Sequence, residues 1–266
     1  MTKTEGQTVN TSANPSIALS GVVVVLLVDY LTQHRAWGWM RLIQGPGALK
    51  DVPGLLFSKV MGSGHGGGFG LRPSGSHQGL ICLFEDEQKA NEFCEGPYVQ
   101  AMIEHSREHW LSSMAVTSAR GQWDEQVWGV TPTDCLLASQ DQTGTESESG
   151  RNLVAVLTRG TIRPAKALAF WRYSPPAQKE LNTAKGCHLA MGLGEAPLLR
   201  QCTFSLWSDT DAMVAYAHSG AHKHAITAAY KNDYFAESMF VRMRVLAMTG
   251  LWLGKRYGVS REVQHG

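Results

Sequence analysis

Apolar residues recur along the chain in an order that is used twice. In the first half, apolar or helix-periodic stretches occupy 22–31, 34–49, 55–64, 79–86, 87–107 and 109–121. The β-branched runs are typical of strands, and the longer stretches with interspersed polar residues are typical of helices. The first half therefore predicts the order strand, helix, strand, strand, helix, strand.

The second half repeats this order with its own residues. Its stretches occupy 153–162, 170–181, 187–195 and 198–209, followed by a helical region through about 232 and a strand at 238–248. Two short anchors correspond as well, MetGlySerGly at 61–64 with MetGlyLeuGly at 191–194, and LeuPheGluAsp at 83–86 with LeuTrpSerAsp at 206–209. Self-similarity over so long a period indicates that the two halves are copies of one unit.

This element order is that of a ferredoxin-like unit, in which two helices cover one face of a four-stranded antiparallel sheet. Two such units can bury their uncovered sheet faces against each other as a barrel, within one chain or between chains. We therefore predict an α+β fold of tandem ferredoxin-like (βαββαβ) repeats, of the dimeric α/β-barrel type. The alternative is one irregular α+β domain whose halves resemble each other by chance, and a homo-oligomer stays open.

Polar stretches mark the boundaries of this arrangement. We predict a disordered N-terminal extension at 1–16, a first half at 17–130, a linker at 131–150, a second half at 151–248 and a C-terminal tail at 249–266.

Composition narrows the range of partners. Hydrophobic residues make up 43% of the chain and charged residues 18%, which excludes disorder as the main state. The formal net charge of +1 provides no field to hold a phosphate backbone, so no nucleic acid partner is expected. Five cysteines without a CxxC pair fit a reducing, cytoplasmic compartment. The longest apolar run, 22–28, is too short to span a bilayer, and no signal peptide is recognisable.

Ten histidines are the most conspicuous source of chemistry, and the densest group is His218, His222 and His224. Gly220 interrupts this group, which argues against a metal pair on one helix face. His222 has no histidine at its counterpart in the first half, so it departs from the repeat. We interpret it as a candidate axial ligand of a planar cofactor such as haem, and the alternative is a solvated helix cap.

Two arginines are further candidates. The glycine-rich stretch at 61–74 lacks a phosphate-loop motif and is predicted to lie over a barrel mouth, where Arg72 could pair with a carboxylate such as a porphyrin propionate. Arg172 follows Trp171 in the second half's first helical region, and this pair suits either a cavity wall or helix packing. We name Arg172 as the candidate catalytic residue, while an exposed surface position is the alternative for Arg72.

The tail combines apolar and basic residues. Leu251, Trp252 and Leu253 precede Lys255 and Arg256, a composition that suits transient contact with a bilayer surface. The alternative is a tail that packs on its own domain.

Several longer motifs resemble one known family, that of spheroidene monooxygenase, the acyclic carotenoid ketolase. They are MGSGHGGGF (61–69), EHW (108–110), SARGQW (118–123), LTRGTIRP (157–164), FWRYSPP (170–176), GLGEAPLLRQCTFSLWSD (192–209), HKHAI (222–226) and ESMFVRMRVL (237–246). The resemblance runs in order through both halves, from about residue 20 to 248.

The resemblance implies an oxygen-dependent monooxygenase that contains haem b, hydroxylates the end of an acyclic carotenoid and oxidises it to a 2-keto group. Reduced ferredoxin would supply the electrons. It also implies kinship with barrel haem proteins such as dye-decolourising peroxidases, chlorite dismutases and aldoxime dehydratases, whose proximal histidine lies in the C-terminal unit. In this chain the second half would then bind haem, with the iron on His222 and with His224 as the neighbouring choice.

The resemblance also implies a cytoplasmic enzyme. Because a carotenoid is insoluble in water, this enzyme is expected to be peripheral at the inner face of the cytoplasmic membrane. The rival readings are a peroxidase- or dehydratase-like enzyme of the same barrel family, and a non-catalytic carrier of haem or carotenoid.

Overall fold

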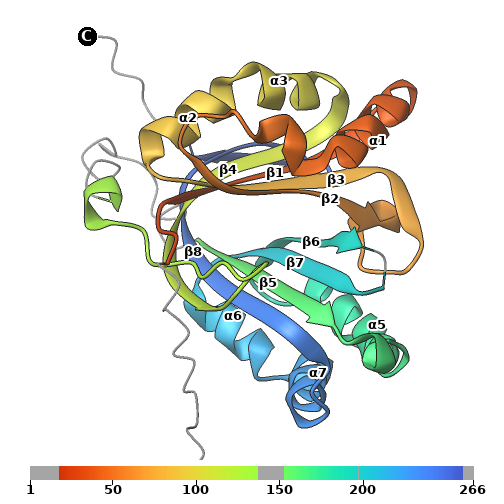
Figure 1. Cartoon of the computed structure of the whole chain (residues 1–266). Helices are drawn as coiled ribbons and strands as arrows, with labels where there is room; N and C mark the ends of the chain where they lie inside the picture. The colour runs from red at the N-terminus through yellow and green to blue at the C-terminus, as the bar shows by residue number, and fades with distance from the viewer. Residues whose placement is uncertain (1–17, 137–152, 197, 260–266) are drawn as a thin grey trace, which may run out of the picture.

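The computed structural model describes residues 18–136, 153–196 and 198–259 (Figure 1). Its strands are β1 (Val22–Tyr30), β2 (Leu55–Gly64), β3 (Pro73–Phe84), β4 (Ser106–Gly121), β5 (Val154–Ile162), β6 (Cys187–Ala196), β7 (Arg200–Trp207), β8 (Phe235–Trp252) and β9 (Lys255–Val259). Its α-helices are α1 (Arg35–Gln44), α2 (Glu87–Glu95), α3 (Pro97–Glu104), α5 (Ala167–Thr183), α6 (Thr210–Ala217) and α7 (Gly220–Lys231). Short 3-10 segments are η1 (Thr32–His34), η2 (Gly45–Leu49), η3 (His65–Gly67) and η4 (Pro164–Lys166).

The element order confirms the predicted tandem ferredoxin-like fold. Each half has strand, helix, strand, strand, helical region and strand, and the second helical region is broken into two helices in both. In the first half the break falls at Gly96 and Pro97, because proline starts a helix readily but cannot continue one. In the second half it falls at Gly220, whose φ of 51° interrupts the helical path.

The strands form one sheet in the order β4-β1-β3-β2-β6-β7-β5-β8-β9, and an additional β4–β8 pairing closes it into a barrel. The two junctions between the halves differ greatly. β4 and β8 pair over a long register that runs from His109↔Leu251 to Gly121↔Met239. At the opposite junction, β2 and β6 share the single residue pair Gly62↔Gly194 within the described chain. One junction is a continuous ladder, and the other is a narrow seam.

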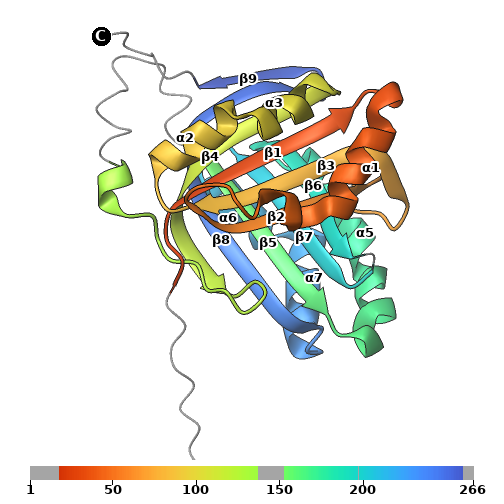
Figure 2. The ribbon, with the colours of Figure 1, turned by 45° about the horizontal axis from the view of Figure 1, so that its top comes forward.

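Both faces of the sheet are covered, which explains why β1 reads as an uninterrupted apolar run. Val23, Val25 and Leu27 point into the barrel lumen, where the rings of Trp110 and Phe204 pack with centroids 5.2 Å apart. The alternate residues of β1 lie beneath α1, α2 and α3, which cover the outer face of the first half (Figure 2). Burying each large apolar side chain in this way contributes about 1.5–3 kcal/mol.

A buried ion network closes one end of the lumen. The Arg159 side chain on β5 is 1% exposed and forms ion pairs with Glu195 on β6, Glu237 on β8 and Asp124 after β4. Lys59 on β2 adds a second cation, 3.1 Å from Glu195. These opposite charges pair with one another, so the network holds side chains from both halves of the chain together around Arg159.

The C-terminal boundary predicted at 248 is wrong. β8 continues through Trp252, and β9 pairs with it from Met248↔Val259 to Trp252↔Lys255. Trp252 is only 2% exposed, and its ring lies edge-on to His77 with centroids 5.9 Å apart. Among the described apolar residues of the tail, Leu253 alone is exposed, at 73%, at the β8–β9 turn. The tail therefore packs on the sheet, and Leu251, Trp252 and Leu253 do not form the exposed patch predicted for membrane contact.

The start of the predicted linker also belongs to the folded body. Thr131 is buried, accepts a hydrogen bond from the backbone N–H of Val116 at 2.6 Å and donates one to the carbonyl of Gly21 at 2.6 Å. The rest of the linker and the predicted extension at 1–16 lie outside the described residues. Within the described ranges, no helix is long and apolar enough to cross a membrane.

Candidate functional site

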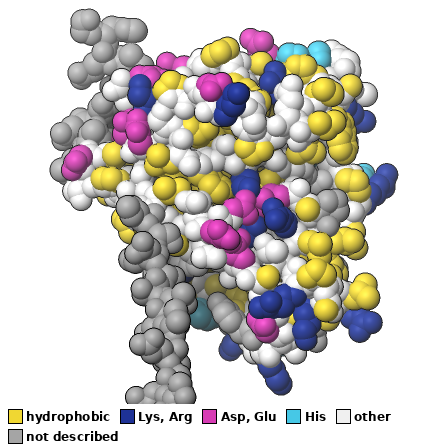
Figure 3. All heavy atoms as spheres, in the orientation of Figure 1, with side chains coloured by type: hydrophobic (Ala, Val, Ile, Leu, Met, Phe, Trp, Pro, Cys, Tyr) yellow, Lys and Arg dark blue, Asp and Glu magenta, His cyan; other side chains and the backbone are white. Residues whose placement is uncertain are grey.

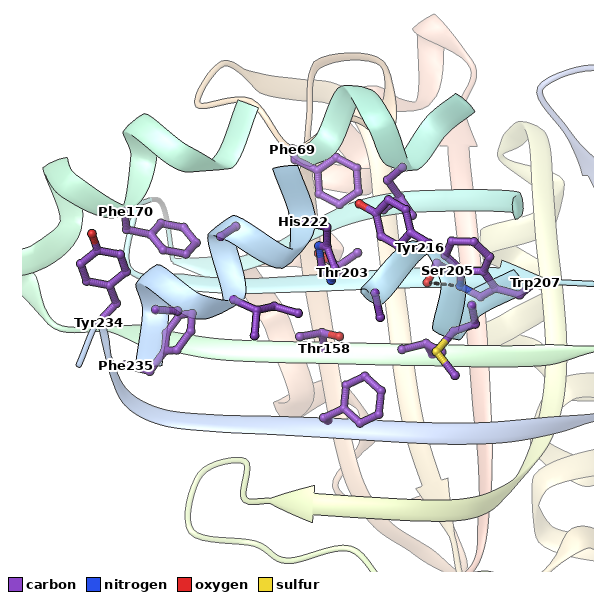
Figure 4. Close-up of a pocket in the computed structure, with 18 residues that line it drawn as sticks. Phe69, Thr158, Phe170, Thr203, Ser205, Trp207, Tyr216, His222, Tyr234 and Phe235 are labelled. Atoms are coloured by element: carbon purple, nitrogen blue, oxygen red, sulfur yellow. Dashed lines mark hydrogen bonds between the residues drawn. The ribbon is translucent and has the colours of Figure 1, made fainter. Parts of the chain in front are cut away.

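A cavity lies in the second half, between the outer face of the sheet and the helices α5, α6 and α7 (Figure 4). The space within it measures about 230 Å³. Its walls are mainly apolar and aromatic, and they include Phe170, Trp207, Tyr216, Phe235 and Phe240. Walls of this composition suit an apolar ligand or the apolar face of a cofactor.

The cavity exists because the second half carries small residues where the first half carries large ones. Both halves pair their first and third strands in the same register. The first half has Val22↔Phe84, Val24↔Cys82 and Leu26↔Leu80, where the second has Val154↔Trp207, Val156↔Ser205 and Thr158↔Thr203. Two leucines are thus replaced by two threonines at the centre of the helix-covered face. The same fold therefore encloses a packed layer in one half and a cavity in the other.

His222 stands in the wall of this cavity, near the start of α7. Its imidazole stacks on the ring of Tyr216, with centroids 4.6 Å apart and planes 27° from parallel. Burial lowers the pKa of His222, while the Glu180 carboxylate on α5 acts in the opposite direction. A neutral imidazole is therefore favoured at neutral pH, and a neutral imidazole has the lone pair that a metal ligand needs.

A glycine makes this approach of α7 to α5 possible. At Gly220 a Cβ atom would lie 2.5 Å from a carboxylate oxygen of Glu180, and the φ of 51° would strain any other residue. The local sequence SerGlyAlaHis therefore starts a helix close against α5 and places His222 in the cavity wall.

His224 lies elsewhere on α7. Two residues further on, it is rotated by about 200° around the helix axis, and its side chain is exposed to solvent. His218 ends α6 and is not among the residues of the cavity wall either. Of the three clustered histidines, the structure brings His222 alone to the described wall.

The two candidate arginines are not brought to the cavity. Arg72 lies between η3 and β3 with an exposed side chain, and its backbone carbonyl accepts a hydrogen bond from the His65 N–H at 2.8 Å. Arg172 is exposed on α5 and is absent from the described cavity wall. Its neighbour Trp171 instead donates a hydrogen bond to the carbonyl of Leu198 at 3.0 Å. Neither arginine therefore contacts the described cavity wall, and the roles predicted for them stay predictions.

The polar groups on the sheet side of the cavity were missed by the sequence analysis. Thr158, Thr203 and Ser205 line it from β5 and β7. The Ser205 hydroxyl accepts a hydrogen bond from the Trp207 indole N–H at 3.0 Å and can still donate its own proton (Figure 4). These polar residues could have been found by comparing the two halves position by position along the paired strands.

Comparisons with known proteins come from sequence and from structure. No family model matches the chain. A spheroidene monooxygenase of Rubrivivax gelatinosus is 44% identical over 241 residues, which cover 89% of this chain and 87% of that protein. A spheroidene monooxygenase of Rhodobacter capsulatus is 32% identical over 226 residues, covering 84% of this chain and 89% of that protein. A crystal structure of aldoxime dehydratase has a TM-score of 0.55 at 12% identity, covering 84% of this chain and 81% of that one, and it shows a shared fold alone.

Proposed function

The chain belongs to the spheroidene monooxygenase family, and we propose that it binds haem b in the cavity of His222 to oxidise the end of an acyclic carotenoid. Membership makes it an oxidoreductase, a carotenoid monooxygenase. The observation that carries the cofactor proposal is an apolar cavity with His222 in its wall, at the place that Leu26 and Leu80 fill in the other half.

The residues present fit haem. The porphyrin supplies four of the iron's ligands itself, so one axial side chain suffices to hold it. Among the described residues of the cavity wall, His222 is the one histidine, and it would supply the single nitrogen ligand that haem iron requires. When bound, haem supplies the activation of O2 that no side chain provides.

The protein's own contribution is positioning and exclusion of water. His222 would hold the iron, and Tyr216 packs on its ring and restricts its rotation. The aromatic walls from Phe170, Phe235 and Phe240 favour an apolar substrate end. Ser205 and Thr203 place hydroxyl groups at the sheet side, where they can donate hydrogen bonds or protons.

The reaction we propose takes place at one carbon at the end of the carotenoid. Each insertion consumes O2, a pair of electrons and a pair of protons, releases water and converts a C–H bond into C–OH. A second insertion at the same carbon gives a geminal diol, which loses water to form the 2-keto group. Reduced ferredoxin is the proposed electron donor. The cytoplasmic location, membrane contact and homo-oligomer stay predictions.

The test is turnover with defined components. The purified haem-loaded protein is incubated under O2 with spheroidene, with or without reduced ferredoxin, and the products are separated by chromatography and mass. The proposal predicts hydroxy and keto products that need both O2 and the electron donor. Product formation driven by peroxide without ferredoxin would indicate a peroxidase-type enzyme instead, and binding without any product would indicate a carrier.

A further inference from the structure

A second cavity opens at the seam between the two halves. It measures about 300 Å³, and it is lined from α1, β2, the segment after β2, β3, β6, β7 and α5. We call this cavity the seam groove. Phe69 belongs to the walls of both the seam groove and the His222 cavity. Figure 4 shows its ring directed toward the region of His222 and Tyr216. The two spaces are therefore neighbours that meet at one aromatic side chain.

Glycines on both strand edges form the seam and set the position of Phe69. β2 and β6 share only the pair Gly62↔Gly194 in the described chain, so side chains fill the rest of the junction. At Gly192 a Cβ atom would lie 2.7 Å from the Phe69 ring, so any larger residue there would displace it. The Ser63 hydroxyl donates a hydrogen bond to the Gly192 carbonyl at 2.6 Å and ties the base of the segment across the seam.

The seam groove combines large apolar side chains with uncharged polar ones, among them Ser63, Gln78 and Gln201. Its large side chains are Trp39, Leu42, Phe69, Leu71, Trp171 and Leu198. Among the described lining residues, His77 and Glu195 are the ionisable ones. Burial lowers the pKa of His77, and Glu195 is neutralised by Lys59 and Arg159. The groove therefore presents no unpaired charge to a ligand.

The rim of the seam groove is apolar and open. Trp39, Leu71 and Leu198 are 42%, 56% and 46% exposed, and each also belongs to the wall. Met40 and Ile43 on α1 continue this surface at 54% and 74% exposed. Hydrophobic side chains gather on the side of the molecule where α1 and the segment after β2 lie (Figure 3). Such a concentration of exposed apolar residues marks a place where an apolar partner binds.

We infer that the seam groove binds the polyene chain of the carotenoid, and that Phe69 is the gate through which the chain's end enters the His222 cavity. This inference rests on the proposed function. Only the end of the substrate reacts, while the rest of a long apolar chain must be held outside the reaction cavity. An uncharged groove that opens outward and meets the cavity at one ring satisfies that requirement. An aromatic side chain rotates about two bonds, so it can close the cavity before the substrate enters and turn aside when the chain's end arrives.

Two exposed leucines with the same backbone conformation provide a matched test. Leu198 lies on the rim of the seam groove with φ 69°, and Leu253 lies at the β8–β9 turn with φ 51°. Aspartate tolerates this conformation better than leucine, so neither Leu198→Asp nor Leu253→Asp is expected to unfold the protein. Binding of spheroidene in detergent micelles is measured by the shift of its absorption bands, which needs no turnover and no haem.

We expect Leu198→Asp to raise the Kd for spheroidene by about tenfold or more, because a charge on the rim must lose water when the polyene binds. Leu253→Asp should keep the Kd and the turnover of the original chain. A change of Phe69→Ala should admit the substrate end more freely, and so lower the concentration at which turnover is half-maximal.

Equal Kd values for Leu198→Asp, Leu253→Asp and the original chain would overturn the groove assignment. If spheroidene binds with the expected dependence on Leu198 but no haem is bound, the groove stands and the proposed cofactor fails. If turnover at spheroidene concentrations below the Kd of the original chain proceeds normally in Leu198→Asp, the proposed function stands and the groove fails.

Discussion

The helix-covered faces of the two halves are built on the same element order and the same strand register, yet one is packed and the other holds a cavity. In the first half, Leu26, Leu80, Phe93 and Met102 are almost completely withdrawn from solvent beneath the helices. In the second half, the buried side chains of the corresponding cluster are, among the described residues, Val156, Leu181, Trp207 and Met213. The difference shows that two copies of one unit can differ in role: the first copy stabilises the fold by packing, and the second leaves space for a ligand.

This division has a thermodynamic consequence. A cavity lined by apolar groups forfeits the contacts that a packed layer would make, so the second half contributes less to stability on its own. A ligand that binds the folded protein and fills the cavity restores stability in proportion to its affinity and concentration. The contrast between the two halves can therefore be measured.

The largest effect is expected from truncation in the packed layer. Leu26→Ala removes a fully buried side chain and should lower the free energy of unfolding by about 2–5 kcal/mol. Thr158→Ala, at the corresponding place beside the cavity, should change it by less than about 1 kcal/mol. Urea unfolding of both variants without added haem checks this, and equal losses would contradict the contrast between the halves.

The next effect comes from copying the packed layer into the second half. Thr203→Leu installs the residue that stands at Leu80 and extends it into the cavity. We expect a protein that folds at least as stably without haem and binds haem several-fold less tightly, since the added side chain occupies ligand space. Haem titration and thermal unfolding give the two readouts. Unchanged haem affinity would show that the cofactor lies elsewhere.

The smallest effect concerns pH. The pKa of His222 in the folded protein is lowered from its ordinary value of 6.5, so the unfolded chain binds more protons between the two values. The contribution of His222 is therefore fully present above pH 6.5 and decreases as the pH falls toward the folded pKa, at no more than about 1.4 kcal/mol per pH unit.

Other histidines also have lowered pKa values, among them His77, His109 and His188, so the whole-protein profile is a sum. The contribution of His222 is isolated by subtracting the profile of His222→Gln measured without haem. A difference that is flat between pH 5 and 7 would contradict the lowered pKa.

Much of the fold could be predicted because periodic apolar runs and repeated anchors survive in the sequence. The boundary at 248 failed for a local reason: Gly250, with a φ of 129° and no side chain, lets β8 pass closely over the backbone of His109 and continue. Pairing with β9 then continues the ladder beyond that glycine.

The site was predictable only in part. His222 could be singled out because it breaks the repeat, whereas Thr158, Thr203 and Ser205 become visible only when the paired strands show which residues share the helix-covered face. Arg72 and Arg172 illustrate the opposite case, since an isolated charge carries no periodic signal that distinguishes a cavity wall from an exposed surface.

The most direct test of the account compares the two neighbouring histidines of α7 by the Soret absorption of the haem-reconstituted protein. His222→Ala removes the imidazole in the cavity wall, and His224→Ala removes an exposed one from the same helix. The account predicts that His222→Ala loses the haem band and that His224→Ala keeps the spectrum and stoichiometry of the original protein. A normal Soret band in His222→Ala together with its loss in His224→Ala would contradict the assignment of the cavity as the haem site.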